Sequence, residues 1–408
     1  MAKPNISVGF KISALTFLIL IISIELVLGY FYPFTKNFWS IQLAPKVGFT
    51  LIPGSEVWIT NFFDFATIER ANSYGFLDRE PEITFTDDET RIVILGDSAV
   101  EAAQVKNNEK FSFLLEQKLI SLNKRRRYKV LSFGFSGTGT ANTIPFYTEI
   151  ARRFKPQLVI LVFNGNDFAN NSPILESVRN GWHPYHPPRP FYDVSGRSIK
   201  KIDVDLSWQE HRIGASDMRV PTMAVNSALD WSLLYVWASN RLFHETRYAE
   251  MREIYAKRIE YLRNLNSEFR IKLAGWSYPE DLDFDEMFSA QKMPLVFEEA
   301  LKLTAHSVQV LKKETAQDGA KLVMFATEYL QAGEDRSLYG RTLKHSLPFA
   351  RLKKIADDLE VPLYNFSRYL SEGNFQFDQL HFSHDGHWSR YGHEIAAEGM
   401  YDFIKNHI

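Results

Sequence analysis

The most informative stretch of the sequence is Arg91-Ile92-Val93-Ile94-Leu95-Gly96-Asp97-Ser98. Its apolar run between a charged residue and a glycine is typical of a buried strand in a parallel sheet. A segment with helical character follows at residues 111–122. A serine at the carboxyl end of such a strand faces the crevice where open α/β sheets bind ligands. Ser98 is therefore a candidate nucleophile, although a turn serine that caps a helix would give the same local pattern.

The alternation of strand and helix continues beyond this stretch and indicates the fold class. Apolar runs predict further strands at residues 128–133, 157–163, 321–327 and 361–366. Between and after them, helices are predicted at residues 143–154, 296–315, 348–359 and 389–404. Five strands with intervening helices predict an α/β fold built on a doubly wound parallel five-stranded sheet.

Three segments lie outside this alternation. The predicted organisation is a transmembrane anchor at residues 1–34, a β-rich lead-in at 35–90 and a main domain at 91–408 that carries an insertion at 168–293. The insertion is too long for a plain loop. It begins rich in proline and aromatic residues and then becomes helical, clearest at residues 228–243 and 248–265, so we expect a lid over the crevice.

Residues 12–34 are nearly all apolar and long enough to span a bilayer. Lys3 and Lys11 precede this run, which favours a cytoplasmic amino terminus and a periplasmic or extracellular remainder. A cleaved signal peptide is the alternative, but no small-residue cleavage site follows the run. We therefore expect a single-pass anchor that holds the chain to the membrane.

The composition excludes several kinds of chemistry. The 408-residue chain contains no cysteine, which excludes disulfides, thiolate nucleophiles and cysteine-ligated zinc. A net charge of -2 gives no reason to expect nucleic acid as a partner. The glycines at 137 and 139 do not form a dinucleotide-binding motif, and the GxSxG elbow is absent. No cofactor is expected.

Two later strand ends carry residues that a nucleophilic serine needs. Gly137 follows the second strand and Asn166 follows the third. In a doubly wound sheet these ends gather at one edge, close to Ser98. The backbone N–H groups of Ser98 and Gly137, together with the side-chain amide of Asn166, would form donors for a tetrahedral oxyanion.

The base is expected from the block Asp378-Gln379-Leu380-His381-Phe382-Ser383-His384-Asp385-Gly386-His387-Trp388-Ser389, just before the last helix. One carboxylate–histidine pair is Asp385 and His387, and a second is Asp378 and His381. Either carboxylate could hold an imidazole in the correct tautomer. The histidines of this block would also suit a metal site, with more at His183 and His186 in the insertion, but no metalloprotease motif occurs and no metal is predicted.

These stretches resemble the SGNH/GDSL hydrolase superfamily in their order and intervals: Gly96-Asp97-Ser98, Ser136-Gly137, Gly165-Asn166-Asp167 and the terminal Asp–His block. The ending Asp385-Gly386-His387-Trp388 is most similar to the membrane-anchored branch that includes alginate-type polysaccharide O-acetyltransferases. The resemblance covers residues 91–167 and 295–408. It implies a flavodoxin-like sheet, a Ser98 nucleophile, a His387 base oriented by Asp385, and an oxyanion hole from Ser98, Gly137 and Asn166.

The sequence departs from the commoner superfamily pattern at one relevant position. That pattern places the aspartate three residues before the histidine, where this chain has His384. The acetyltransferase-like branch uses a two-residue spacing, which favours Asp385 and His387 over Asp378 and His381.

The resemblance implies a membrane-anchored, extracytoplasmic serine esterase or O-acyltransferase that acts on O-acetyl or other acyl esters. Small esters or cell-envelope glycan esters are the expected substrates, and a membrane acyltransferase is an expected partner. Water as the acceptor gives hydrolysis and a sugar hydroxyl gives transfer, so the same residues serve both reactions. The alternative is a catalytically silent scaffold subunit of a membrane complex. The presence of every candidate catalytic residue argues against this alternative.

Overall fold

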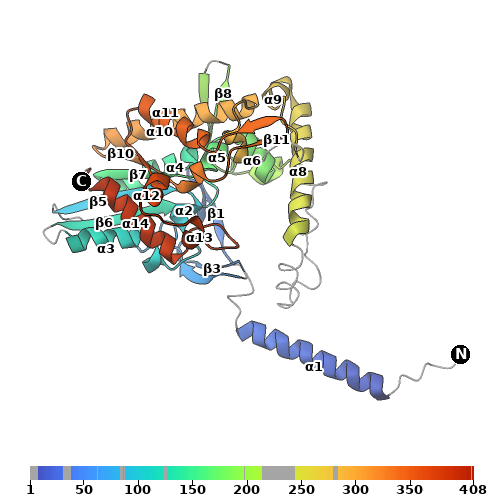
Figure 1. Cartoon of the computed structure of the whole chain (residues 1–408). Helices are drawn as coiled ribbons and strands as arrows, with labels where there is room; N and C mark the ends of the chain where they lie inside the picture. Colours follow the sequence, from blue (N-terminus) through green and yellow to red (C-terminus); the bar gives the residue numbers. More distant parts are fainter. Residues whose placement is uncertain are drawn as a thin grey trace.

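The computed structural model describes residues 8–30, 38–61, 63–82, 86, 88–122, 126–196, 198–213, 244–278, 284–405 and 407–408. Its centre is a five-stranded parallel sheet in the order β13-β10-β7-β5-β6 (Figure 1). These strands are β5 (Glu89–Gly96), β6 (Arg127–Gly134), β7 (Leu158–Phe163), β10 (Lys321–Ala326) and β13 (Leu363–Asn365). The predicted doubly wound five-stranded sheet is confirmed, and its order along the chain is the flavodoxin-like one.

Alternate residues of β5 point to opposite faces of the sheet, and helices cover both. Ile92 and Ile94 belong to a core shared with α3 (Phe111–Leu122), α12 (Phe366–Glu372), α13 (Phe377–Leu380) and α14 (Arg390–Ile404). Val93 and Leu95 belong to a core shared with α4 (Thr140–Pro145), α10 (Leu295–Gln317) and α11 (Leu347–Asp358). Because both faces are covered, β5 is a continuous apolar run rather than an alternating one.

The predicted helix at residues 143–154 is broken into shorter pieces. An α-helical turn, α4, ends at Pro145, a π-helical turn follows at Phe146–Ile150 (η3), and a 3-10 turn closes the segment at Ala151–Phe154 (η4). Proline has no N–H to give to the preceding turn, which accounts for a change of helical hydrogen bonding here. The remaining helices of the domain agree with the predicted segments to within a few residues at each end.

The segment before the sheet forms two antiparallel hairpins. They are β1 (Ile41–Ala44) with β2 (Gly48–Leu51), and β3 (Glu56–Thr60) with β4 (Ala66–Arg70). Leu51, Val57 and Phe76 are buried in the same core as Val93 and Leu95. The lead-in therefore packs on the sheet domain.

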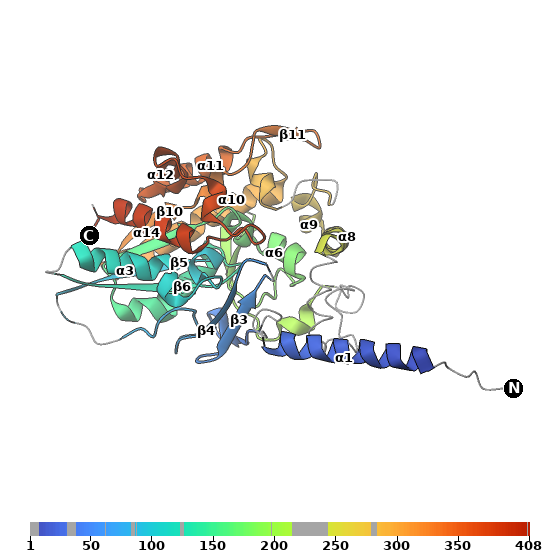
Figure 2. The ribbon, with the colours of Figure 1, turned by 60° about the horizontal axis from the view of Figure 1, so that its bottom comes forward.

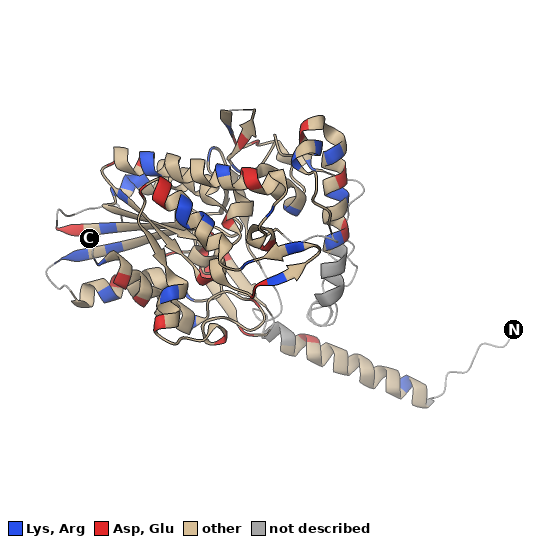
Figure 3. Ribbon diagram, turned by 45° about the horizontal axis from the view of Figure 1, so that its top comes forward, with Lys and Arg blue, Asp and Glu red and all other residues tan. Residues whose placement is uncertain are grey.

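The first helix, α1 (Val8–Tyr30), stands apart from the sheet domain (Figure 2). Its segment Gly9–Val27 is long and apolar enough to cross a membrane, and none of it is buried in the protein. Figure 3 shows the helix almost free of charged residues along its length. A signal sequence would have the same length and composition.

The insertion is built into the domain. It contains α5 (Asp167–Asn170), α6 (Pro173–Asn180), β8 (Phe191–Ser195), β9 (Ser198–Ile202), η5 (Trp208–His211), α8 (His244–Leu265), α9 (Ser267–Lys272) and η6 (Glu286–Ser289). The helix expected at 248–265 is confirmed as part of α8, whereas the one expected at 228–243 lies outside the described residues. Leu262, Phe269 and Trp276 of the insertion are fully buried in the core that also holds Val93.

Five short elements complete the described chain. They are η2 (Asn107–Glu109), η7 (Glu328–Gln331) and the hairpin of β11 (Arg336–Leu338) with β12 (Arg341–Leu343), together with the four-residue helix α2 (Ser98–Glu101) that follows β5. The strand β7 pairs with β5 on one side and β10 on the other. The two strand ends at β5 and β7 flank the point where the strand order reverses, which is where such sheets bind ligands.

Candidate active site

Ser98 is the first residue of α2 and lies directly beyond the end of β5. The preceding residue, Asp97, is fully buried and caps α2, since its Oδ1 accepts a hydrogen bond from the N–H of Ala99 at 3.0 Å. The cap fixes the tight passage from strand to helix. Ser98 is thereby held at the reversal point of the sheet rather than pointing into the core.

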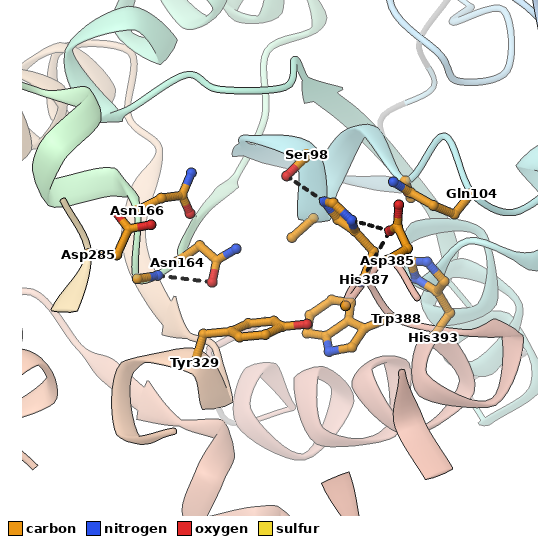
Figure 4. A pocket seen from close by; sticks show the side chains of 14 residues that line it. Ser98, Gln104, Asn164, Asn166, Asp285, Tyr329, Asp385, His387, Trp388 and His393 are labelled. Carbon is orange, nitrogen blue, oxygen red and sulfur yellow. Dashed lines mark hydrogen bonds and ion pairs between the residues drawn. The ribbon is translucent and has the colours of Figure 1, made fainter. Parts of the chain in front are cut away.

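Ser98, His387 and Asp385 form a continuous hydrogen-bonded chain (Figure 4). The Nε2 atom of His387 lies 2.9 Å from Ser98 Oγ, and its Nδ1 atom is hydrogen-bonded to Asp385 Oδ1. A carboxylate can only accept, so Nδ1 carries the hydrogen and Nε2 is free to accept the hydroxyl proton of Ser98. This arrangement is the nucleophile, base and orienter geometry of serine hydrolases.

The loop that carries His387 is held at both ends. Ser389 caps α14 by accepting from the N–H of Gly392 at 3.2 Å, and the N–H of Phe382 donates to the carbonyl of His387 at 2.9 Å. The capped start of α14 therefore presents His387 at the same sheet edge as Ser98. Ser389 is thus the N-cap of α14.

The charges around His387 favour its protonated form. Burial lowers the pKa of His387, but the hydrogen bond and charge of Asp385, with the charges of Asp97 and Glu101, outweigh burial and raise that pKa above 6.5. An imidazolium that forms when Ser98 loses its proton would be stabilised in this setting.

The second predicted pair, Asp378 and His381, does not form. His381 is buried, its Nδ1 lies 2.7 Å from the carbonyl of Phe377, and its Nε2 lies 2.6 Å from Glu328 Oε1. The same Glu328 oxygen accepts from the indole N–H of Trp388 at 2.6 Å. Because both ring nitrogens of His381 are hydrogen-bonded to other groups, neither can accept the proton of Ser98.

His384 and His393 have separate partners and do not converge on one point. His384 lies 3.0 Å from Asp64 and stacks on Phe63 at a ring distance of 4.5 Å. His393 accepts from the N–H of Phe111 at 3.3 Å, and burial lowers its pKa to about 3. These positions give no shared set of metal ligands around His387.

The predicted oxyanion donors are the backbone N–H groups of Ser98 and Gly137 and the side-chain amide of Asn166. Among the described residues, the backbone N–H groups of Ser98 and Gly137 donate no hydrogen bond. The amide of Asn166 donates one hydrogen to Asp97 Oδ2 at 3.0 Å, which leaves its second N–H as a possible donor to a substrate. Asn166 lines the same pocket as Ser98, whereas Gly137 is not among the residues that line it.

Gly137 occupies the third position of a turn whose N–H of Thr138 donates to the carbonyl of Phe135 at 3.3 Å. Its φ of 69° is the value that this position of a type II turn requires, and glycine adopts it without strain. Among the described residues the Gly137 N–H donates to no other group, so it could donate to a substrate.

Two side chains that the sequence did not indicate clamp this turn. Glu101 accepts from the Ser136 N–H at 3.0 Å and also from its hydroxyl. Arg189, from the insertion, donates to the carbonyl of Gly137 at 2.5 Å and to that of Ser136 at 3.2 Å. Burial lowers the pKa of Arg189 to about 10, which still leaves it charged at neutral pH. No spacing rule connects these residues to the turn, because both contacts arise from the tertiary fold.

The triad opens into a cavity of about 410 Å³. Figure 4 shows Asn164, Asn166 and Asp285 across the cavity from the triad, and Tyr329 along its floor. The Tyr329 hydroxyl is buried and has no hydrogen-bond partner among the described residues. Burial and the charge of Glu328 raise the pKa of Tyr329, so it remains a neutral donor. The cavity offers both polar groups and the aromatic ring of Tyr329 to a substrate.

Comparison with protein-family models gives no match, and comparison with curated proteins gives none. Solved structures of low identity do match. TesA is 10% identical over 78% of this chain and 100% of that chain, with a TM-score of 0.37. A structure of Axe2, an acetylxylan esterase from Geobacillus stearothermophilus, is 9% identical over 77% and 94%, with a TM-score of 0.37. A GDSL-like lipase from Parabacteroides merdae is 11% identical over 79% and 98%, with a TM-score of 0.38. We therefore assign a function from this chain's own side chains.

Proposed function

We propose that the chain is a serine-dependent ester hydrolase or O-acyltransferase of the SGNH type that works through an acyl-Ser98 intermediate. The observation that carries this proposal is the hydrogen-bonded chain from Asp385 through His387 to Ser98. The three residues come from two distant parts of the sequence and meet at the sheet edge where ligands bind.

The proposed reaction follows from the hydrogens already in place. As Ser98 Oγ attacks the ester carbonyl carbon, its proton passes to Nε2 of His387. The imidazolium then gives that proton to the departing alcohol oxygen as the carbon–oxygen bond breaks. In the second half, water or an acceptor hydroxyl gives its proton to His387 and attacks the acyl carbon, and Ser98 recovers its proton as it leaves.

Charge develops on the carbonyl oxygen during both halves of this reaction. The unpaired N–H groups of Ser98 and Gly137 and the remaining N–H of Asn166 are the donors that we assign to it. Such donors are held in place before reaction, so they cost no reorganisation when the oxyanion forms. Asp97 holds the Asn166 side chain by its other hydrogen, and Arg189 and Glu101 hold the turn.

The cavity supports an ester of a polyhydroxylated alcohol as the substrate. The amides of Asn164 and Asn166 and the carboxylate of Asp285 line the cavity and can pair with hydroxyl groups of such a substrate. An aromatic ring along one wall can pack on the apolar face of a sugar. We accordingly propose O-acetyl or other O-acyl esters of cell-envelope glycans.

We further propose that α1 anchors the chain in a membrane with the catalytic domain on the outer side. The length and apolar character of α1 support anchoring, and Lys3 and Lys11 support the orientation. A membrane acyltransferase that hands over the acyl group remains part of the proposal, on the strength of the resemblance of Asp385-Gly386-His387-Trp388 to the O-acetyltransferase branch.

The full chain in detergent should release p-nitrophenol from p-nitrophenyl acetate. Ser98→Ala and His387→Ala should reduce kcat by about 10⁴-fold or more, because each removes a member of a cooperative unit. Gln379→Ala, in the same block but outside the hydrogen-bonded chain, is the matched control and should keep its activity. A folded wild type without activity would favour the scaffold alternative.

Hydrolysis and transfer are separated by adding an alcohol acceptor, such as a xylo-oligosaccharide, to the same reaction. Transfer predicts an acetylated oligosaccharide at the expense of free acetate, whereas hydrolysis predicts that the ratio of acetate to p-nitrophenol stays at one. Both outcomes require Ser98.

A further inference from the structure

A second cluster of polar side chains lies in the insertion, outside the candidate active site. His186 Nδ1 lies 2.7 Å from Asp205 Oδ2, and His211 Nε2 lies 3.9 Å from the same oxygen. The ligand atoms of these three residues all lie within 4.8 Å of one another. We propose that His186, Asp205 and His211 bind a divalent transition-metal ion of the zinc class.

The distances suit such an ion. Zinc binds imidazole nitrogen and carboxylate oxygen at about 2.0–2.2 Å in a tetrahedron, which separates neighbouring ligand atoms by about 3.3–3.5 Å. The two measured separations, 2.7 and 3.9 Å, lie on either side of that value. Small side-chain rotations would equalise them, and water would take the fourth position.

The carboxylate is oriented by its neighbours as a metal ligand usually is. Asp205 Oδ1 accepts from the N–H of Ser207 at 2.8 Å and from its hydroxyl at 2.7 Å. These two bonds fix the carboxylate plane and leave Oδ2 directed at the histidines. Outer hydrogen bonds of this kind commonly hold metal-ligating carboxylates.

The backbone also brings the three ligands together before any ion binds. The N–H of Asp205 donates to the carbonyl of Pro187 at 2.8 Å, which ties the Asp205 segment to the residue after His186. The 3-10 turn η5 starts with a bond from the Trp208 N–H to the Asp205 carbonyl at 3.2 Å and ends at His211. Trp208 packs edge-on against Phe49 at 5.7 Å, so the turn is fixed to the lead-in.

Two histidines share one carboxylate here, and this distinguishes the cluster from ordinary surface pairs. The rings of His186 and His211 stack at a centroid distance of 4.1 Å. Stacking two imidazoles is unfavourable if both are charged, and a metal ion needs them neutral. Elsewhere His345 pairs with Asp335 at 2.7 Å, the same length as the pair of His186 and Asp205, but without a second histidine among the described residues.

The site would stiffen the part of the insertion that reaches the oxyanion turn. Only Pro187 and Pro188 separate His186 from Arg189. Because the proline ring fixes the backbone angle φ, this link between the two residues has little freedom to bend. We therefore assign the ion a structural role: it should raise the thermal stability of the full chain without entering the chemistry at Ser98.

The test is a titration of the full, chelator-treated chain in detergent with ZnCl₂ alone, followed by calorimetry, metal analysis after dialysis and thermal unfolding. We expect one zinc ion per chain and a higher Tm with zinc. His186→Ala and His211→Ala should weaken binding about tenfold or more, and Ser207→Ala should weaken it to a smaller extent. His345→Ala is the matched control and should bind as the wild type does.

Two results would overturn the proposal: no zinc uptake by the wild type, or equal uptake by the wild type, His186→Ala and His211→Ala. His211 is exposed, so its replacement should leave the fold intact. The thermal unfolding transition of each variant measured without zinc reports on its fold and does not depend on the outcome for zinc.

Discussion

At the scale of single residues, the pKa of His387 links the geometry to an observable. The base must be neutral to accept the Ser98 proton, so kcat/KM should rise with pH through the pKa of His387, which Asp385 raises above 6.5. Asp385→Asn removes the charge that raises this pKa. It should shift the midpoint of the pH profile downward and lower kcat by about 10⁴-fold, because the tautomer is no longer fixed.

The control for that prediction is Asp378→Asn, which alters the carboxylate of the pair that does not form. Its profile should match the wild type. A midpoint that stays unchanged in Asp385→Asn would contradict the role of Asp385.

Asn166 provides a second prediction at this scale. Asn166→Ala removes one oxyanion donor, so kcat should fall about 10²–10³-fold while KM changes little. Asn164→Ala alters a neighbouring amide of the same cavity and is the matched control. It should affect KM more than kcat. The reverse pattern in steady-state kinetics on p-nitrophenyl acetate would remove Asn166 from the oxyanion hole.

The choice between two histidines shows what a sequence can decide about single residues. Both Asp–His pairs are plausible from spacing, and the resemblance to the acetyltransferase branch favoured Asp385 and His387. The structure supplies the physical reason against the other pair, since His381 is held by Phe377 and Glu328. Glu328 lies 53 positions away in the chain, so no local pattern could have indicated that contact.

At the scale of elements, the turn after β6 is held in place by a side chain of the insertion. Arg189 binds two carbonyls of this turn in a forked arrangement that lysine cannot reproduce. Arg189→Lys should therefore lower kcat about tenfold or more and leave KM nearly unchanged, because a displaced Gly137 N–H weakens an interaction that is made only in the transition state.

Arg212→Lys, which alters another arginine of the insertion that lies over the Trp208 ring, is its matched control. Equal loss in both variants, or a loss confined to KM, would show that Arg189 supports the fold and does not position the turn.

The elements themselves were largely predictable from hydrophobic period and length. The five strands of the sheet lie where apolar runs of suitable length stand between helical segments. The breaks in the helix at 143–154 were not predicted, although Pro145 was a local signal for them. The order of the strands depends on contacts between distant segments, and only the general rules for doubly wound sheets limited it.

At the scale of the whole molecule, α1 predicts attachment to a membrane. The full chain should stay in the membrane fraction after an alkaline carbonate wash, and externally added protease should cleave the catalytic domain. Leu18→Arg, within the apolar run, should weaken insertion by about 2.5–3.5 kcal/mol and release part of the chain. Leu206→Arg, at an exposed leucine of the insertion, is the control.

Release of the wild-type chain, or a mature amino terminus beyond residue 30, would contradict the anchor and favour a cleaved signal sequence.

The insertion marks the limit of prediction at this scale. Its presence and the helix at 248–265 could be inferred from length and pattern, and a lid function stays a prediction. That Leu262, Phe269 and Trp276 pack into the main core could not be inferred. Burial against distant strands produces no hydrophobic periodicity that a sequence pattern could reveal. The same holds for the placement of Arg189 and Asp285 around the site.

The proposed reaction requires that Ser98 carries the acyl group. The most direct measurement is peptide mapping by mass spectrometry after the full chain has been mixed rapidly with p-nitrophenyl acetate and quenched in acid. We expect an acetyl group on the peptide that contains Ser98, formed together with a burst of p-nitrophenol, and no such adduct in His387→Ala. An acetyl group found only on other residues would contradict the role of Ser98. Turnover without any adduct or burst, together with full activity in Ser98→Ala, would contradict it as well.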